Sequence, residues 1–208
     1  LAGSAVLLLS IQFDLLRARV PELNSLFHPQ NMVWLAVALV AAKVLHELAH
    51  GLTCKHYGGS CHEMGLMLLI FAPCLYCNVT DAWVLPSKWQ RAAISAAGVF
   101  AEVALASLCT WLWWFSEPGF FNALLLNVML VCSVSTLIFN GNPLLRFDGY
   151  YVLSDLVEVP NLHQRSQAIL LGWLQRWFLG IRHGPPMVAE RRSGLLALYA
   201  LASTSYRW

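Results

Sequence analysis

The sequence predicts an all-α, polytopic membrane protein with a small β-hairpin or re-entrant segment. Of its 208 residues, 58% are hydrophobic and only 12% are charged, whereas roughly 25% are charged in an average soluble domain. Three apolar stretches are long enough to cross a bilayer, which takes about 20 helical residues. The nine tryptophans agree with this class, because tryptophan is enriched at membrane interfaces.

The three predicted spans follow one another along the chain. The first, Asn31–Tyr57, is mostly apolar over its first half. The second, Ala92–Phe115, contains a single charged residue, Glu102, and the third, Phe120–Phe139, contains none. The turn between the last two spans is very short and holds Pro118, so these spans are expected to form an antiparallel helical hairpin.

The shorter apolar segments predict the accessory elements. Gly65–Cys77 is too short to cross and holds Pro73, which favours a strand pair or a re-entrant loop. Ile169–Ile181 is typical of a helix lying in the interface, and Gly184-Pro185-Pro186 breaks the chain after it. A further apolar run begins at Leu195–Ala202.

The ends and the overall composition narrow the class further. Leu1–Phe13 is half a span, so we expect residues 1–208 to be a single membrane-embedded domain truncated at both ends. The net charge of +2 is too small and too dispersed to favour binding of nucleic acid. The six cysteines are scattered, which predicts reduced packing residues instead of a disulfide framework.

The residues with the clearest chemistry are His46, Glu47 and His50, which form an H-E-x-x-H pattern at the end of the first span. On a helix, positions four apart share a face, so both imidazoles can hold one zinc ion while Glu47 acts as general base toward water. A structural zinc site is the competing interpretation, but such a site has no use for a base. The apolar surroundings predict a metal at or below a membrane surface.

A third protein ligand is expected, because catalytic zinc sites usually have three plus an open position. The segment from Phe139 to Tyr151 offers Asp148. Pro143 would end the preceding helix and let the chain turn back toward the histidines. Gly149 permits a backbone conformation that other residues resist. The predicted ligand set is therefore His46, His50 and Asp148, with one Zn²⁺ per chain.

Both motifs together resemble the site-2 protease family of membrane-embedded zinc metalloproteases. That family pairs an H-E-x-x-H helix with a later F-N-x-x-P-x-x-x-x-D-G-type segment, here Phe139 to Gly149, and the likeness covers about Val33 to Leu162. The resemblance implies a site-2-protease-like helical core, Glu47 as catalytic base, and Asn140 as a catalytic residue that binds substrate or stabilises the oxyanion. Many relatives carry Asn in a Gly-Pro-x-x-Asn pattern where this chain has Glu102, so the role of that position stays open.

The string from Asn142 to Asp155 looks like a bacterial branch of peptide zinc metalloproteases associated with secretion and peptide maturation. This implies hydrolysis of a membrane-spanning or hydrophobic peptide substrate in the bacterial cytoplasmic membrane, with a secretion-system partner. The alternative is a catalytically silent scaffold or subunit of a peptide export system. A zinc transporter is disfavoured, because its ligands would be spread along a pathway instead of converging.

Several polar groups keep two interpretations each. Lys43 can pair with Glu47 or meet another carboxylate, and Glu102 can be functional or form a structural hydrogen bond. A second group of metal-binding residue types invites a second metal, although packing cysteines and loop histidines are favoured: Cys54, His56, Cys61, His62, Cys74 and Cys77.

Orientation follows from the basic residues. Lys88, Arg91 and Arg146 flank the second and third spans on one side, whereas the turn joining those spans has no basic residue. The positive-inside rule therefore places that turn outside and the zinc motif near the cytosolic face. Arg17 and Arg19 then fall on the external side, against the rule.

Overall fold

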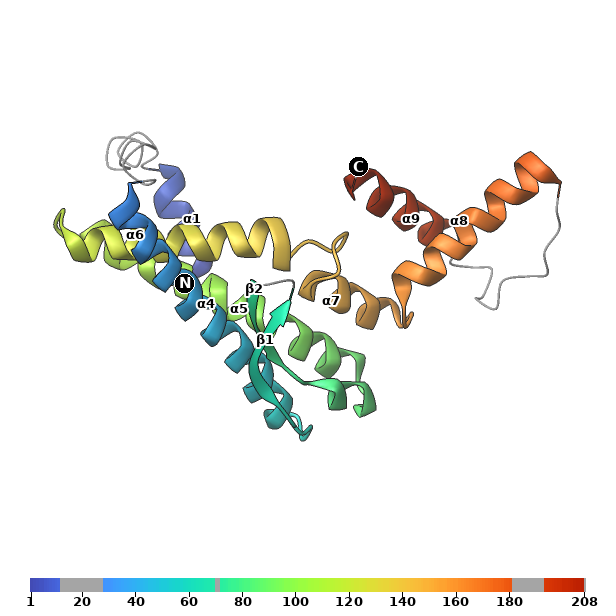
Figure 1. Cartoon of the computed structure of the whole chain (residues 1–208), viewed down its shortest axis with the longest axis horizontal. Helices are drawn as coiled ribbons and strands as arrows, with labels where there is room; N and C mark the ends of the chain where they lie inside the picture. Colours follow the sequence, from blue (N-terminus) through green and yellow to red (C-terminus); the bar gives the residue numbers. More distant parts are fainter. Residues whose placement is uncertain (12–27, 70–71, 181–192, 208) are drawn as a thin grey trace.

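The computed structural model describes residues 1–11, 28–69, 72–180 and 193–207. Three long helices form the core, and a pair of C-terminal helices extends away from it (Figure 1). In chain order the elements are α1 (Ala2–Ile11), α4 (Pro29–His56), β1 (Met64–Leu69), β2 (Ala72–Cys77), the 3₁₀ turn η1 (Thr80–Val84), α5 (Lys88–Phe115), α6 (Phe120–Val134), the π-helical segment η2 (Ser135–Asn140), α7 (Asp148–Val157), α8 (Leu162–Leu179) and α9 (Ser193–Arg207).

The core helices match the three predicted spans. Within the described residues, α4, α5 and the continuous stretch of α6 and η2 have the length and apolar composition that crossing a bilayer requires. α5 begins at Lys88, one turn earlier than expected. The chain is therefore mostly helical with a small sheet, as expected for a helical membrane protein.

The core helices expose many large apolar side chains and bury several polar ones. Val40 and Leu137 expose 59% and 76% of their surface, while Glu102 and Asn127 are each only 1% exposed. Charged residues are almost never fully buried in soluble proteins unless they are paired. Lipid as the surrounding solvent accounts for this arrangement, because polar groups must then be satisfied inside the bundle.

α5 and α6 form the predicted antiparallel hairpin. Near the turn, the Asn122 side-chain amide donates to the Trp113 carbonyl at 3.0 Å. At the other end, the Ser135 hydroxyl lies 3.3 Å from Glu102 Oε1. From the first contact to the second, the residue numbers rise along α6 and fall along α5, so the two helices run in opposite directions. An apolar seam between them contains Cys109, Trp113, Leu125, Leu126 and Met129.

The segment expected to be a strand pair or a re-entrant loop is a strand pair. β1 and β2 are antiparallel, with Met64 opposite Cys77 and Leu68 opposite Pro73. The open end of the hairpin packs on α4 beside Gly51, where a Cβ atom would lie 3.2 Å from Cys77 Sγ. The hairpin therefore sits beside the helix that carries the histidine motif.

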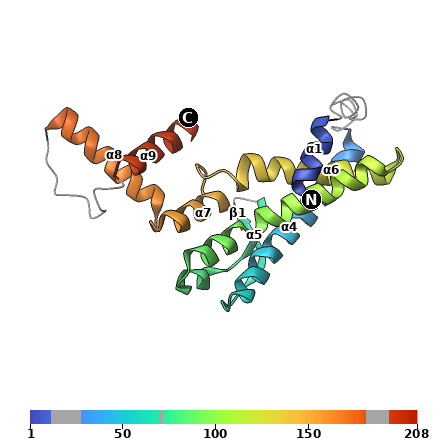
Figure 2. The same ribbon diagram turned by 180° about the vertical axis from the view of Figure 1, so that it is seen from behind.

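The C-terminal elements hold a second apolar cluster, and they include a helix that the sequence reading missed. α7 begins at Asp148, where the sequence analysis predicted a zinc ligand but no helix. Figure 2 shows α8 and α9 side by side, away from the core. The cluster that joins α7, α8 and α9 contains Tyr150, Val159, Leu162, Ile169, Leu196 and Ala197. Trp177 and Phe178 on α8 are 83% and 71% exposed, which suits the predicted interfacial helix.

Some expectations concern residues outside the described part of the chain. These are the Gly184-Pro185-Pro186 break, the basic pair Arg17 and Arg19, and the last two residues of Leu1–Phe13. They remain predictions.

A reciprocal amide pair between α4 and α6 allows a test of the core packing. Asn127 Nδ2 donates to Asn31 Oδ1 at 2.8 Å, and Asn31 Nδ2 donates to Asn127 Oδ1 at 3.3 Å. In a double-mutant cycle with Asn31→Ala and Asn127→Ala, we expect a coupling energy of about 0.6 kcal/mol and no more than about 1.7 kcal/mol, the average and the maximum for hydrogen bonds between membrane helices. Unfolding in detergent measures it, and strictly additive losses would contradict the pairing.

Candidate metal centre

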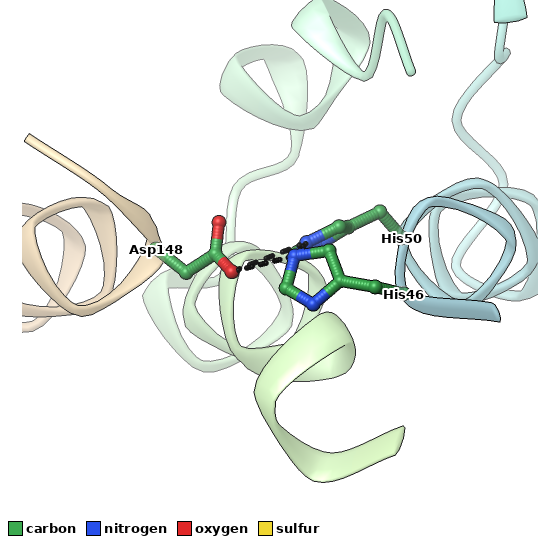
Figure 3. Close-up of side chains that lie close together, drawn as sticks. All are labelled: His46, His50 and Asp148. Carbon is green, nitrogen blue, oxygen red and sulfur yellow. Dashed lines mark hydrogen bonds and ion pairs between the residues drawn. The ribbon is translucent and has the colours of Figure 1, made fainter. Parts of the chain in front are cut away.

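Two imidazoles project from one face of α4 close to its C-terminal end. His46 and His50 are one turn apart and are 4% and 6% exposed. Their Nε2 atoms lie 3.2 Å from each other. In Figure 3 both rings point away from α4 toward Asp148, which comes from a different element. The spacing of four residues has therefore brought the two nitrogens together, as expected for a helix.

Asp148 reaches the histidines because the chain reverses after η2. Asn142 Oδ1 accepts the backbone N–H of Leu144 at 2.9 Å, which stabilises the turn. Gly149 lies against Gly141, whose carbonyl oxygen would be 2.6 Å from an added Cβ. The prediction that Gly149 adopts a backbone conformation restricted to glycine is wrong, since positive φ among the described glycines occurs at other positions. The close approach of two backbone segments is what requires glycine here.

The three predicted ligands form one compact group. Asp148 Oδ2 lies 2.9 Å from His46 Nε2 and 3.5 Å from His50 Nε2. Within the described residues this is the group of three or more His, Cys, Asp or Glu side chains whose donor atoms converge. A tetrahedral zinc site with bonds of about 2.0–2.1 Å to nitrogen and oxygen has edges of about 3.3–3.4 Å between its ligand atoms. The observed separations therefore match the size of such a site.

The partners of the other ring nitrogens show that the group suits a cation. His50 Nδ1 lies 2.7 Å from the Ile94 carbonyl oxygen, which can only accept, so the ring proton is on Nδ1 and Nε2 carries a lone pair. His46 Nδ1 lies 3.1 Å from Glu102 Oε1, again an acceptor. Lone pairs of two imidazoles and a carboxylate thus converge, and Asp148 Oδ2 has no hydrogen bond within the protein. A zinc ion would satisfy all three atoms.

Asp148 is ionised in this setting. Burial by itself raises the pKa of Asp148, but His46 and His50, which donate N–H groups and carry positive charge when they are protonated, outweigh burial and hold the pKa at about 2. Asp148 also occupies the first turn of α7, where the helix dipole favours a negative charge. An anionic ligand is therefore available at any physiological pH.

A cavity of about 340 Å³ opens beside the three ligands. Glu47, the predicted general base, lines this cavity together with His50 and Asp148. Asp155 lines the same cavity, where its Oδ2 accepts from Ser95 at 3.1 Å and its Oδ1 lies 3.4 Å from Arg91 Nε. The cavity therefore brings a carboxylate base, a candidate metal site and space for part of a substrate together.

Asn140, the other predicted catalytic residue, lies outside this cavity lining. Its side-chain nitrogen lies 3.2 Å from each carboxylate oxygen of Glu102 and 3.1 Å from Ser135 Oγ. The same carboxylate contacts Lys43, whose ammonium nitrogen is 2.8 Å from Glu102 Oε1. Of the two interpretations of Lys43, the structure supports pairing with another carboxylate over pairing with Glu47.

The cysteine and histidine residues between positions 54 and 77 do not assemble a comparable group in the described part of the chain. Cys61 and Cys77 are in contact, with 3.3 Å between their sulfur atoms. Burial, followed by the neighbouring Cys61, raises the pKa of Cys77 to about 12. A protonated thiol is a poor metal ligand, so packing cysteines remain the favoured interpretation.

Several residues around the site were not identified from the sequence. Arg91 had been noted only as a charge flanking a span, and Ser95, Gly98 and Asp155 had no assigned place in the site. The proximity of Ser95 to Asp155 depends on how α5 packs against α7, which local sequence does not reveal. The carbonyl of Ile94 leaves no sequence signal, because every residue has one.

Comparison with known proteins gives one informative similarity. The chain is 26% identical over 134 residues to "Putative peptide zinc metalloprotease protein YydH" of Bacillus subtilis (strain 168), and the match covers 63% of this chain and 51% of that protein. The chain thus spans about half the length of this relative. No protein-family model and no solved structure matches it.

Zinc content tests whether the two distant motifs build one site. We expect about one zinc per chain in the purified parent protein and a clear loss in Asp148→Ala, because only two neutral imidazoles then remain. Elemental analysis of detergent-purified protein measures this, with Asp81→Ala as control because Asp81 lies outside the group of three. Full zinc retention without Asp148 would remove it from the ligand set.

Gly98 provides a second test, independent of any ligand atom. A Cβ atom at Gly98 on α5 would lie under 3.0 Å from both imidazole rings. We therefore expect Gly98→Ala to displace the histidines and lower zinc occupancy, whereas Gly172→Ala on α8, where nothing lies within 4 Å, should keep it. Equal zinc content in the two variants would contradict the close approach of α5 to the histidines.

Proposed function

We propose that this chain is a zinc metalloprotease of the site-2 type that hydrolyses peptide bonds in a membrane-spanning or hydrophobic peptide substrate. The observation that carries the proposal is the convergence of His46, His50 and Asp148 beside a cavity that Glu47 also lines. The helices that build the site are apolar enough to cross a bilayer. The resemblance of the two motifs to the site-2 protease family and the name of the Bacillus relative support the same reaction class.

Zinc held by the three ligands would supply Lewis-acid chemistry that makes water nucleophilic at neutral pH and polarises a carbonyl group. Glu47 is placed on the cavity wall to take a proton from the attacking water and return it to the leaving amide nitrogen. The oxygen of water would add to the carbonyl carbon first, and the C–N bond would then break as the nitrogen takes up the proton from Glu47. The products are a carboxylic acid and an amine.

The size of the cavity bears on the form of the substrate. A volume of about 340 Å³ accommodates a short extended stretch with its side chains. An intact α-helix, which is about 10–12 Å across with its side chains, would need more space. The carbonyls of a helix are also occupied by hydrogen bonds. We propose that the substrate unwinds locally before cleavage, and that the open end of the β-hairpin, where Cys77 borders the cavity, lies along the unwound stretch.

The Asn140 amide nitrogen has two N–H groups, and it contacts both the Glu102 carboxylate and the Ser135 hydroxyl. The predicted oxyanion role therefore requires the amide to give up one of these partners. That role remains a prediction from the resemblance alone. In contrast, the role of Glu47 needs no rearrangement, since its side chain already borders the cavity. We therefore place the reaction on Glu47 and the three ligands.

The proposed setting is the bacterial cytoplasmic membrane, with the site toward the cytosol. His50 near the end of α4, Arg91 in the first turn of α5 and Asp148 after η2 gather at one end of the core. The positive-inside rule assigns the end with the basic residues to the cytosolic side. A partner in peptide secretion or maturation fits the branch that the second motif resembles.

Glu47→Gln tests the proposal, because it removes the base and leaves all three ligands in place. We expect this variant to keep its zinc and to lose at least about 100-fold in cleavage rate, a typical share for a general base. A panel of fluorogenic hydrophobic peptides in detergent serves as the assay, and Glu117→Gln in the distant α5–α6 turn serves as the control. Cleavage that survives in Glu47→Gln would exclude this mechanism, and peptide export that survives without cleavage would favour a scaffold.

A further inference from the structure

A single carboxylate lies behind the candidate metal site, on α5 and outside the cavity lining. Glu102 is 1% exposed, although it sits in the middle of a helix apolar enough to cross a membrane. Ionisable groups at such positions are costly unless they are paired and used. Its partners come from α4 and from the π-helical segment that ends the third span, and they are Lys43, His46, Ser135, Thr136 and Asn140.

The hydrogen bonds around Glu102 identify it as an anion. The Lys43 ammonium donates to Oε1 at 2.8 Å, and the Thr136 hydroxyl donates to Oε2 at 2.6 Å. The Asn140 amide nitrogen, also a donor, lies 3.2 Å from both oxygens. A protonated carboxyl group would need an acceptor, and these partners offer donors. The positive charge of Lys43 balances the carboxylate inside the bundle.

The same carboxylate faces the back of a metal-site histidine. Glu102 Oε1 is the acceptor nearest to His46 Nδ1 among the contacts of this ring, at 3.1 Å, and the nitrogen is buried with no other polar partner among the described residues. An anionic oxygen at this distance holds the ring proton on Nδ1 and leaves the Nε2 lone pair directed at Asp148 and His50. His50 receives the corresponding support from a neutral group, the Ile94 carbonyl. The two histidines are therefore supported unequally.

We propose that Glu102 is a positioning residue that sets the metal affinity of the site by holding His46 from behind, with Lys43 as its counter-ion. The proposal rests on the proposed zinc site and goes beyond it. It states that His46 and His50 bind the metal with different strength, and that Glu102, which touches neither metal nor substrate, causes this difference. A carboxylate partner makes an imidazole a stronger donor than a carbonyl partner does, and loss of such partners typically weakens metal binding by about 10-fold to about 100-fold.

The network also explains why the third span ends in a π-helical segment. Ser135, Thr136 and Asn140 all lie within η2, and each contacts the Glu102 carboxylate. The wider turn of a π-helix changes the register of side chains along one face, and such segments are frequent at functional sites. The segment that precedes the turn to Asp148 is thereby tied to the residue that holds His46.

The test is metal titration of the full chain purified in detergent, with Zn²⁺ and Co²⁺ as the probes. We expect Glu102→Gln to lower the affinity for Zn²⁺ by about 10-fold to about 100-fold and to shift the visible absorption bands of bound Co²⁺, because the donor strength of His46 changes. Ser107→Ala is the matched control. Ser107 is also buried on α5, but its hydroxyl donates only to the Val103 carbonyl of the same helix, so affinity and bands should stay as in the parent.

The charge-balanced variant Lys43→Met with Glu102→Gln guards against a folding defect, because it removes the buried carboxylate and its partly buried counter-ion together. It should show the same loss of affinity as Glu102→Gln. Parent affinity and parent Co²⁺ bands in both variants would overturn the role of Glu102 while leaving the zinc site intact. A parent protein that binds neither metal would instead overturn the proposed function, so the two failures are distinguishable.

Discussion

The close antiparallel packing of α5 against α4 is the contact on which the candidate site depends. Ile94, Gly98 and Glu102 are spaced by four residues and share one face of α5. Ile94 contacts His50, Glu102 contacts His46, and Gly98 between them leaves room for both rings. Small residues allow this close approach of membrane helices. Because functional residues recur every four positions on both helices, the Ile94 carbonyl faces one imidazole and the Glu102 carboxylate faces the other.

The parts of the site that the sequence predicted are those set by local geometry. His46, Glu47 and His50 share a helix, and their relation follows from its period. Asp148 was found because a catalytic zinc site needs a third ligand and Pro143 marks a turn. For Lys43, the local rule allowed a partner four residues away, yet the structure pairs it with Glu102. Attraction is stronger inside the bundle, where the dielectric is low.

The features that the sequence did not reveal depend on contacts between distant segments or on backbone atoms. The cavity wall formed by Ser95 and Asp155 joins α5 to α7. The helix α7 was missed because the sequence argument for this stretch concerned only the turn at Pro143 and the ligand Asp148. The reason for Gly149 was also misjudged. A glycine can be required because another backbone segment lies close, as Gly141 does here, or because the residue has a left-handed backbone conformation. The sequence shows a glycine in both cases and cannot distinguish the two causes.

Three carboxylates near the histidines have different environments, and these suit three different tasks. Glu47 is half-buried on the cavity wall, where it can exchange a proton with water. Asp148 faces two imidazoles, which keep it ionised and make it a metal ligand. Glu102 is enclosed by donors behind His46, and it lies outside the residues that line the cavity. The His46 ring lies between Glu102 and Asp148. The carboxylate of Glu102, which fixes the geometry of His46, is thereby kept apart from Glu47, which must gain and lose a proton.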